Sequence, residues 1–399
     1  MNADLRVPAP ELGRRIGAFQ DRLRADGIDG ALILQKADLF YLSGTAQDGI
    51  LYVPADGAPL LMIRKSLERA QGESLLPEVR PLTGTGDLLR EMEARSFPFP
   101  KVLGLEMDVL PAALYLGFQR RFPGARLVGV SSRLRAVRAV KSPYELGRLR
   151  EAGRRADQVL AQVAEHIRPG VTELALAGRV EALARELGHP GLVRMRRWGS
   201  EIFYGHLMAG ETAARPSFLA SPTGGAGTGP ATPQSAGLRP IGPGEPILVD
   251  YVFVWEGYIA DQTRVFVLGE PPDDLLRAHD AMREVQSALQ GAARPGAVAG
   301  DLYEMAVAEA ERLGFGEYFM GSGDDRISFV GHGVGLELDE FPFIARGQTQ
   351  ALEAGMVIAL EPKQILPGRG VVGIENTHVV GPEGLTPLTA FREEMIRIG

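Results

Sequence analysis

Two runs decide the fold of this chain: PILVDYVFVW at residues 246–255 and YIADQTRVFVL at residues 258–268, joined by Glu256-Gly257. Both runs are rich in the β-branched and aromatic residues that favour strands. A two-residue connection with glycine in second place is typical of a tight β-hairpin. We therefore expect one long antiparallel hairpin over residues 246–268.

The register of this hairpin brings two acidic residues together. If the turn closes at Glu256-Gly257, Asp250 opposes Thr263 and Asp261 opposes Val252. Opposed residues share a face of the sheet, and every second residue returns to that face. The two aspartates are then diagonal neighbours on one face, about 7 Å apart at Cβ. Such carboxylates repel each other and resist desolvation, and a bound cation relieves both effects. Either aspartate alone would fit a solvated face, but the aligned pair favours a metal site.

One histidine and two glutamates are further candidates. His332 lies in GHGVG (331–335), where we expect the glycines to allow a tight turn and close approach to the imidazole. A structural role is the alternative for a single histidine. Glu361 ends the apolar run 356–360, and Glu375 lies in a second expected strand at 371–380. Whether the two glutamates face the same side depends on the connecting loop, which the sequence leaves open.

These candidates are four carboxylates and one imidazole, in a chain without cysteine. Four negative charges would balance two divalent ions, and oxygen-rich ligands favour Mn²⁺, with Co²⁺, Fe²⁺ or Zn²⁺ as alternatives. Two such ions can activate water and polarise a carbonyl group. We therefore predict a centre for two divalent ions, held by Asp250, Asp261, His332, Glu361 and Glu375.

The N-terminal part alternates helical and strand patterns. A helix is expected over 10–26 and another near 109–121, with short strands at 31–34, 50–53, 60–63 and 102–105. This alternation predicts an α/β sheet covered by helices. Residues 131–141 are basic and without sustained period, and Ser142, Pro143 and Glu145 then predict a capped helix start. We place the domain boundary near residue 138, which gives domains 1–138 and 139–399.

Composition narrows the class of protein. Of 399 residues, 45% are hydrophobic and 23% charged, which is ordinary for a globular protein. The net charge of −7 and the absence of a basic run argue against a nucleic-acid or membrane partner. With neither an apolar run of spanning length nor a secretory leader pattern, we expect a cytoplasmic protein. The Gly- and Pro-rich stretch 216–245 lacks the context of a phosphate-binding loop, so a flexible or substrate-side loop is favoured over phosphate binding.

The order of the five candidate ligands resembles that of the pita-bread metallopeptidases, which include Xaa-Pro dipeptidase, aminopeptidase P and methionine aminopeptidase, and their non-peptidase relative creatinase. The matching stretches are Val249-Asp250, Gly257–Arg264, Gly331–Leu336, Glu361-Pro362 and Ile374–Asn376. The N-terminal stretches Ile28–Ala31 and Tyr41–Gly44 also resemble the creatinase/prolidase N-terminal domain. The resemblance implies an α/β N-terminal creatinase-like domain followed by an α+β pita-bread (creatinase/aminopeptidase) catalytic domain.

The resemblance also implies a role for each ligand. Asp261 and Glu375 would bridge both ions, Asp250 would chelate one ion, and His332 and Glu361 would bind the other. Glu361 would be the catalytic residue that handles the proton of the attacking water.

Three positions depart from the pattern of these peptidases. Where these peptidases have a histidine seven residues after the ligand histidine, this chain has Asp339. Where they have an arginine two residues before the last glutamate ligand, this chain has Gly373. These peptidases also have a histidine upstream of the hairpin. The aligned position here is Ser217 or Thr232, neither of which is a histidine, and His206 is the candidate to replace it in space. We predict that Asp339 and His206 contact substrate; the alternative for Asp339 is that it turns away and caps local backbone.

The favoured function is a dinuclear metal-dependent hydrolase that cleaves the N-terminal bond of short peptides, as Xaa-Pro dipeptidases and aminopeptidases do. One alternative is a non-peptidase of the same fold, such as a creatinase-like C–N hydrolase or a lyase acting on a small polar metabolite. A second is a binding protein without catalysis, although such relatives lose metal ligands and this chain keeps all five. The resemblance further implies a homodimer.

Overall fold

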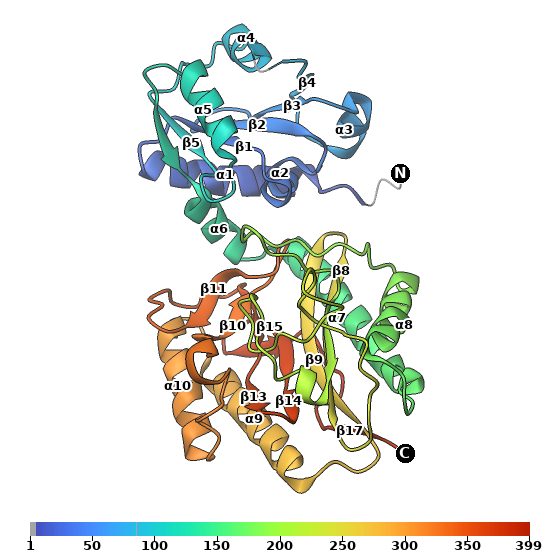
Figure 1. The fold of residues 1–399 in the computed structure, drawn as a ribbon. Helices are drawn as coiled ribbons and strands as arrows, with labels where there is room; N and C mark the ends of the chain where they lie inside the picture. The colour runs from blue at the N-terminus through green and yellow to red at the C-terminus, as the bar shows by residue number, and fades with distance from the viewer. Residues whose placement is uncertain (1–4, 85) are drawn as a thin grey trace. The chain divides into compact units, whose positions relative to one another are not determined.

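The computed structural model describes residues 5–84 and 86–399. The chain separates into two compact units that divide between Arg138 and Ala139. Each unit has its own sheet (Figure 1). Each unit also has its own hydrophobic core. Among the described residues, none of the helices has both the length and the apolar composition needed to cross a bilayer.

The N-terminal unit is a mixed sheet with helices, as the alternating pattern predicts. The sheet has the strand order β4-β3-β2-β1-β5-β6. Its strands are β1 (Gly30–Ile33), β2 (Gly49–Pro54), β3 (Leu60–Ile63), β4 (Val79–Pro81), β5 (Val102–Leu105) and β6 (Arg126–Gly129). Its helices are α1 (Ala9–Ala25), α2 (Lys36–Ser43), α3 (Leu67–Glu73), α4 (Gly86–Ala94), α5 (Ala112–Arg121) and α6 (Ser131–Ala139).

Helix α6 corrects the interpretation of residues 131–141 as lacking periodic structure. Leu134 and Val137 are buried and lie three residues apart, so they form a narrow apolar face. The arginines between and around them hide this period in the sequence. One of them, Arg138, is itself buried and forms an ion pair with buried Asp38.

The C-terminal unit is built on a larger sheet, and the predicted hairpin lies within it. The main strand order is β11-β10-β12-β15-β9-β8-β7, with β16 pairing with β15 and β17 with β9. The strands are β7 (Gly205–Ala209), β8 (Pro246–Trp255), β9 (Tyr258–Leu268), β10 (Phe329–Gly333), β11 (Glu340–Ala345), β12 (Val357–Leu360), β15 (Glu375–Val380), β16 (Leu385–Pro387) and β17 (Ile396–Ile398). A separate two-stranded sheet pairs β13 (Lys363–Leu366) with β14 (Gly370–Gly373).

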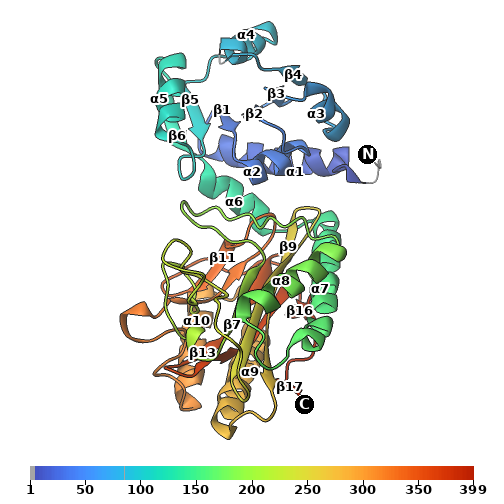
Figure 2. The same ribbon diagram turned by 45° about the vertical axis from the view of Figure 1, so that its right-hand side comes forward.

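Two pairs of helices bury the sheet: α7 (Pro143–Val163) with α8 (Glu173–Glu186), and α9 (Asp273–Ala292) with α10 (Ala299–Arg312). The predicted capping box at the start of α7 is confirmed, because Ser142 and Glu145 each cap the other's backbone. Figure 2 shows α7 and α8 beside the long β8–β9 hairpin. Val249, Tyr251 and Phe253 pack into the core under these helices. Alternation along β8 therefore leaves Asp250 on the opposite face.

Candidate metal centre

The hairpin register is confirmed and brings the two aspartates together. Asp250 pairs with Thr263 and Val252 pairs with Asp261. Both aspartates line a cavity on the face of the sheet that points away from α7 and α8. Thr377 on β15 exchanges hydrogen bonds with the backbone of Asp261 at 2.9 and 2.8 Å, which fixes that residue in place.

His332 reaches the same cavity from β10, which lies between β11 and β12. The expected tight turn is wrong, because residues 331–333 continue the strand. The flanking glycines are required by crowding: a Cβ at Gly331 would lie 2.5 Å from the carbonyl oxygen of Ala359, and one at Gly333 would lie 2.3 Å from that of Phe341. The glycines thus let neighbouring strands approach around a buried imidazole.

Glu361 and Glu375 meet because of how β12 and β15 pair. Leu360 pairs with Asn376 in this antiparallel ladder, so the next position along places Glu361 opposite Glu375. The expected single strand over 371–380 is wrong. It breaks at Ile374, where the β13–β14 hairpin is inserted between the two glutamates. This insertion settles the question that the sequence left open.

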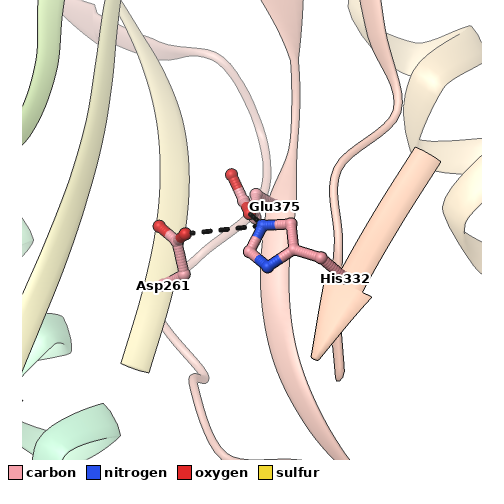
Figure 3. A group of neighbouring side chains, drawn as sticks. All are labelled: Asp261, His332 and Glu375. Carbon is pink, nitrogen blue, oxygen red and sulfur yellow. Dashed lines mark ion pairs between the residues drawn. The ribbon is translucent and has the colours of Figure 1, made fainter. Parts of the chain in front are cut away.

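The imidazole of His332 and three carboxylates around its Nε2 atom form one compact group. The Nε2 atom of His332 lies 3.8 Å from Asp261 Oδ2, 3.6 Å from Glu361 Oε1 and 3.7 Å from Glu375 Oε1. Figure 3 shows Asp261, His332 and Glu375 pointing toward one another. Ligand atoms of these three buried residues lie within 4.8 Å of one another, which is a spacing that can hold a metal ion.

The electrostatics of this group favour a bound cation. Burial raises the pKa of Asp261 well above its ordinary value, and the charges of Glu375 and Asp250 raise it further. Burial also raises the pKa of Glu375 to about 7, although nearby Lys363 opposes this rise. Asp261 Oδ1 and Glu375 Oε1 are buried without a hydrogen-bond partner. Unsatisfied carboxylate oxygens around an imidazole are a fitting donor set for one divalent ion.

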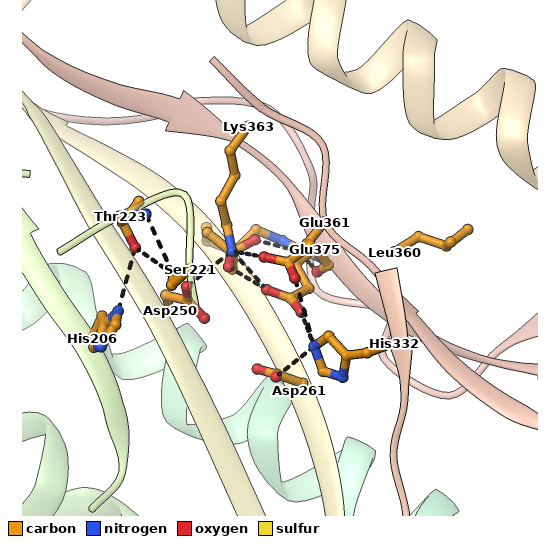
Figure 4. Close-up of polar contacts among 12 residues, drawn as sticks. His206, Ser221, Thr223, Asp250, Asp261, His332, Leu360, Glu361, Lys363 and Glu375 are labelled. Atoms are coloured by element: carbon orange, nitrogen blue, oxygen red, sulfur yellow. Dashed lines mark hydrogen bonds and ion pairs between the residues drawn. The ribbon is translucent and has the colours of Figure 1, made fainter. Parts of the chain in front are cut away.

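Lys363 is the residue of this centre that the sequence analysis missed. Its Nζ atom donates to Glu361 Oε2 at 2.7 Å, and to Asp250 Oδ2 and Glu375 Oε2 at 3.0 Å each (Figure 4). Although burial alone would raise the pKa of Asp250, the Lys363 ammonium and His206 hold it below its ordinary value. Three of the four candidate carboxylate ligands are thus hydrogen-bonded to one ammonium group.

The remaining candidates also lie in this cavity. His206 on β7 pairs with Asp250 across the sheet, and its Nδ1 lies 3.3 Å from Thr223 Oγ1. Burial lowers the pKa of His206, and its Nε2 is without a hydrogen-bond partner. Asp339 Oδ1 lies 3.5 Å from His332 Nδ1. Leu219, Ala220 and Ser221 show that the 216–245 stretch supplies part of the wall.

A buried cluster of carboxylates and one imidazole suits a metal-dependent hydrolase. Residues 147–382 match the model of metallopeptidase family M24, and residues 15–140 match the creatinase/prolidase N-terminal domain. The chain belongs to metallopeptidase family M24. The resemblance inferred from the sequence and the predicted two-domain fold are therefore confirmed.

The chain is similar to known dipeptidases over most of its length. The Xaa-Pro dipeptidase of Lactobacillus delbrueckii subsp. lactis is 28% identical over 389 residues, covering 94% of this chain and 97% of that protein. The Xaa-Pro dipeptidase of Lactobacillus helveticus is 31% identical over 286 residues, covering 71% of this chain and 69% of that protein. The structure of an Xaa-Pro dipeptidase from Bacillus anthracis has a TM-score of 0.82 at 24% identity, covering 97% and 99%, which shows the shared fold.

Proposed function

We propose that this metallopeptidase cleaves the N-terminal bond of short peptides, with Xaa-Pro dipeptides as its preferred class of substrate. The observation that carries the proposal is the group formed by Asp261, His332 and Glu375, buried in the cavity with unpartnered carboxylate oxygens. The names of the relatives support the substrate class, since several are Xaa-Pro dipeptidases. We further propose that residues 139–399 form the catalytic domain and residues 1–138 the N-terminal domain.

Each residue of the proposed centre has a distinct task. Asp261, His332, Glu361 and Glu375 would hold a divalent ion, with Mn²⁺ favoured by the oxygen-rich set. When bound, such an ion acts as a Lewis acid toward water and the scissile carbonyl. Glu361 would accept the proton of the attacking water and deliver it to the leaving amine. The neighbouring hydrogen-bonded strands β10, β12, β15 and β9 present these side chains and keep their positions fixed before substrate arrives.

Three further side chains of the cavity fit the ends of a peptide. Arg197 lines the cavity and is exposed, so its guanidinium can bind a substrate carboxylate. His206 offers an unpartnered Nε2 beside Asp250, where it can hydrogen-bond a substrate carbonyl. Asp339 lines the cavity with a partly exposed carboxylate, which can accept from an α-ammonium group.

The Asp339 proposal predicts a selective loss. In Asp339→Asn the negative charge is removed while the shape is kept, so binding of substrates with a free α-ammonium should weaken by roughly 1.5–3 kcal/mol, the scale of a charged hydrogen bond. The rise should fall on KM, and metal content at saturating Mn²⁺ should stay the same. N-acetylated peptides are the matched control, because they lack the cation. Unchanged kinetic constants for every cationic substrate would return Asp339 to a structural role.

The proposed function is tested by a turnover screen with Mn²⁺ and Co²⁺. The panel should contain Xaa-Pro dipeptides, their C-terminal amides, longer Xaa-Pro peptides, Xaa-Ala dipeptides and small amidines. We expect the Xaa-Pro dipeptide acids to have the highest kcat/KM. Preference for longer peptides would indicate an aminopeptidase, and turnover of amidines alone would overturn peptidase activity in favour of a creatinase-like hydrolase.

We also propose that two copies of this chain associate. Three large apolar side chains are exposed, and each is a sequence neighbour of a cavity-lining residue: Trp198 at 91%, Phe203 at 69% and Phe218 at 56%. Large apolar side chains with this degree of exposure are candidates for a surface that a partner covers. Light scattering at micromolar concentration should give the mass of a homodimer, and a fully active monomer would remove this proposal. A cytoplasmic location stays a prediction from the sequence.

A further inference from the structure

Lys363 is a buried ammonium group whose hydrogen bonds all end on candidate metal ligands. Its side chain is 1% exposed. An ammonium group has three donors, and here each of three carboxylates, from Asp250, Glu361 and Glu375, lies within 3.0 Å of Nζ. The group is therefore satisfied in this position without water or any further partner. A buried lysine is costly unless it is paired in this way.

The β13–β14 hairpin is shaped around this lysine. Lys363 pairs with Gly373 across the hairpin. A Cβ at Gly373 would lie 2.8 Å from Lys363 Cα and 2.9 Å from its Cγ, so a larger residue there would push the lysine stem away. Met320 holds the lysine backbone from the other side, where Met320 N donates to Lys363 O at 2.9 Å. The position of the ammonium group is thus built into the fold.

The two glutamates divide their oxygens between two cation positions. Glu361 and Glu375 each direct Oε2 to the lysine and Oε1 toward His332 Nε2. Asp250 directs Oδ2 to the lysine, whereas Asp261 directs Oδ2 toward His332. One cation position therefore lies on the Asp250 side and contains the ammonium group. The other lies on the Asp261 and His332 side, where the unpartnered oxygens are.

We propose that the Lys363 ammonium replaces one of the two metal ions, so that the centre binds a single divalent ion at Asp261, His332, Glu361 and Glu375. This inference rests on the proposed function. The inference revises the expectation of two ions. That expectation balanced four carboxylates against two divalent ions and did not include the positive charge of Lys363, which lies among those carboxylates. A second divalent ion bound to the same oxygens, at about 2.0–2.2 Å, would have to occupy the place of Nζ. Lys363 is then a positioning residue that holds three carboxylates as a second ion would.

The first test uses the wild-type chain. Metal-stripped protein should be dialysed to equilibrium against Mn²⁺, and metal content measured together with the electron paramagnetic resonance spectrum. We expect one Mn²⁺ per chain with the spectrum of an isolated ion. Two ions per chain with a spin-coupled spectrum would overturn the lysine inference and leave the proposed function intact. Absence of bound metal would overturn the proposed function itself.

A variant then tests whether the lysine is the cause. Lys363→Met removes the charge and keeps much of the side-chain volume, so the freed carboxylates should bind a second Mn²⁺ per chain. Lys141→Met is the matched control, because Lys141 is also buried and paired, 3.2 Å from Glu340, and neither residue lines the cavity. The stoichiometry of this control should remain one ion per chain. A single ion in folded Lys363→Met would overturn the inference. If Lys363→Met fails to fold, the wild-type spectrum still decides the question.

Discussion

Asp261→Asn should lose the bound divalent ion and, with it, on the order of 10³-fold or more of the peptidase activity. Lewis-acid assistance contributes several kcal/mol to such reactions, and each 1.36 kcal/mol is a factor of ten in rate. An amide is a much poorer ligand than a carboxylate, and Asp261 is the residue whose free Oδ1 and raised pKa mark it as lacking a cation. Metal content and kcat/KM, measured on the same preparation, check this result.

Thermal unfolding separates this loss from misfolding. The metal-free variant should be at least as stable as metal-free wild type, because the substitution removes a buried carboxylate that neighbouring acids repel. Mn²⁺ should stabilise the wild type by about 2.7 kcal/mol at a hundredfold excess over Kd and leave the variant unchanged. Asp274→Asn is the control, since Asp274 is an exposed acid paired with Arg369. Full metal occupancy in Asp261→Asn would remove Asp261 from the centre.

Glu361→Gln should separate binding from chemistry. The single carbonyl oxygen of glutamine can keep the ligand position of Glu361 Oε1, but its amide NH2 group cannot accept the hydrogen bond that Oε2 accepts from Lys363, and glutamine cannot take a proton from water. Loss of general base and acid catalysis typically lowers rates by about 10²–10⁴-fold. We therefore expect a fall of this size in kcat and weaker metal binding that saturating Mn²⁺ overcomes, because Asp261, His332 and Glu375 still form the ligand group.

The comparison with Asp261→Asn makes this prediction specific. Both variants lose activity, but Glu361→Gln should keep its metal at saturating Mn²⁺, whereas Asp261→Asn should not. If Glu361→Gln retained wild-type kcat, another group would have to handle the proton. His206, whose Nε2 is unpartnered in the same cavity, would be the next residue to substitute.

The part of this centre that follows local rules could be predicted from the sequence. The two-residue turn fixes the β8–β9 register, and that register alone places Asp250 and Asp261 on one face. The capping box at Ser142 is likewise local. The meeting of Glu361 with Glu375 is not local, because it depends on β12 pairing with β15 across an inserted hairpin.

Lys363 shows a different limit of sequence analysis. Lys363 lies two residues after Glu361, just beyond the end of an apolar strand. A lysine in such a place is ordinarily exposed. Its burial follows from the β13–β14 hairpin, which turns residues 363–366 back over the site. One signal in the sequence could have indicated this burial: Lys363 and Gly373 lie at equal distances on either side of Gly368 in the turn at Pro367-Gly368, so a hairpin there would pair them. Side-chain directions around that turn were needed to interpret it.

The most direct test of the metal centre is an anomalous difference map at the manganese edge, from crystals grown with Mn²⁺. We predict one peak per chain, about 2.0–2.2 Å from oxygens of Asp261 and Glu375 and from His332 Nε2, with Lys363 Nζ still bound to Asp250. A map without a peak at His332, or with metal in the place of the Lys363 ammonium, would contradict the account.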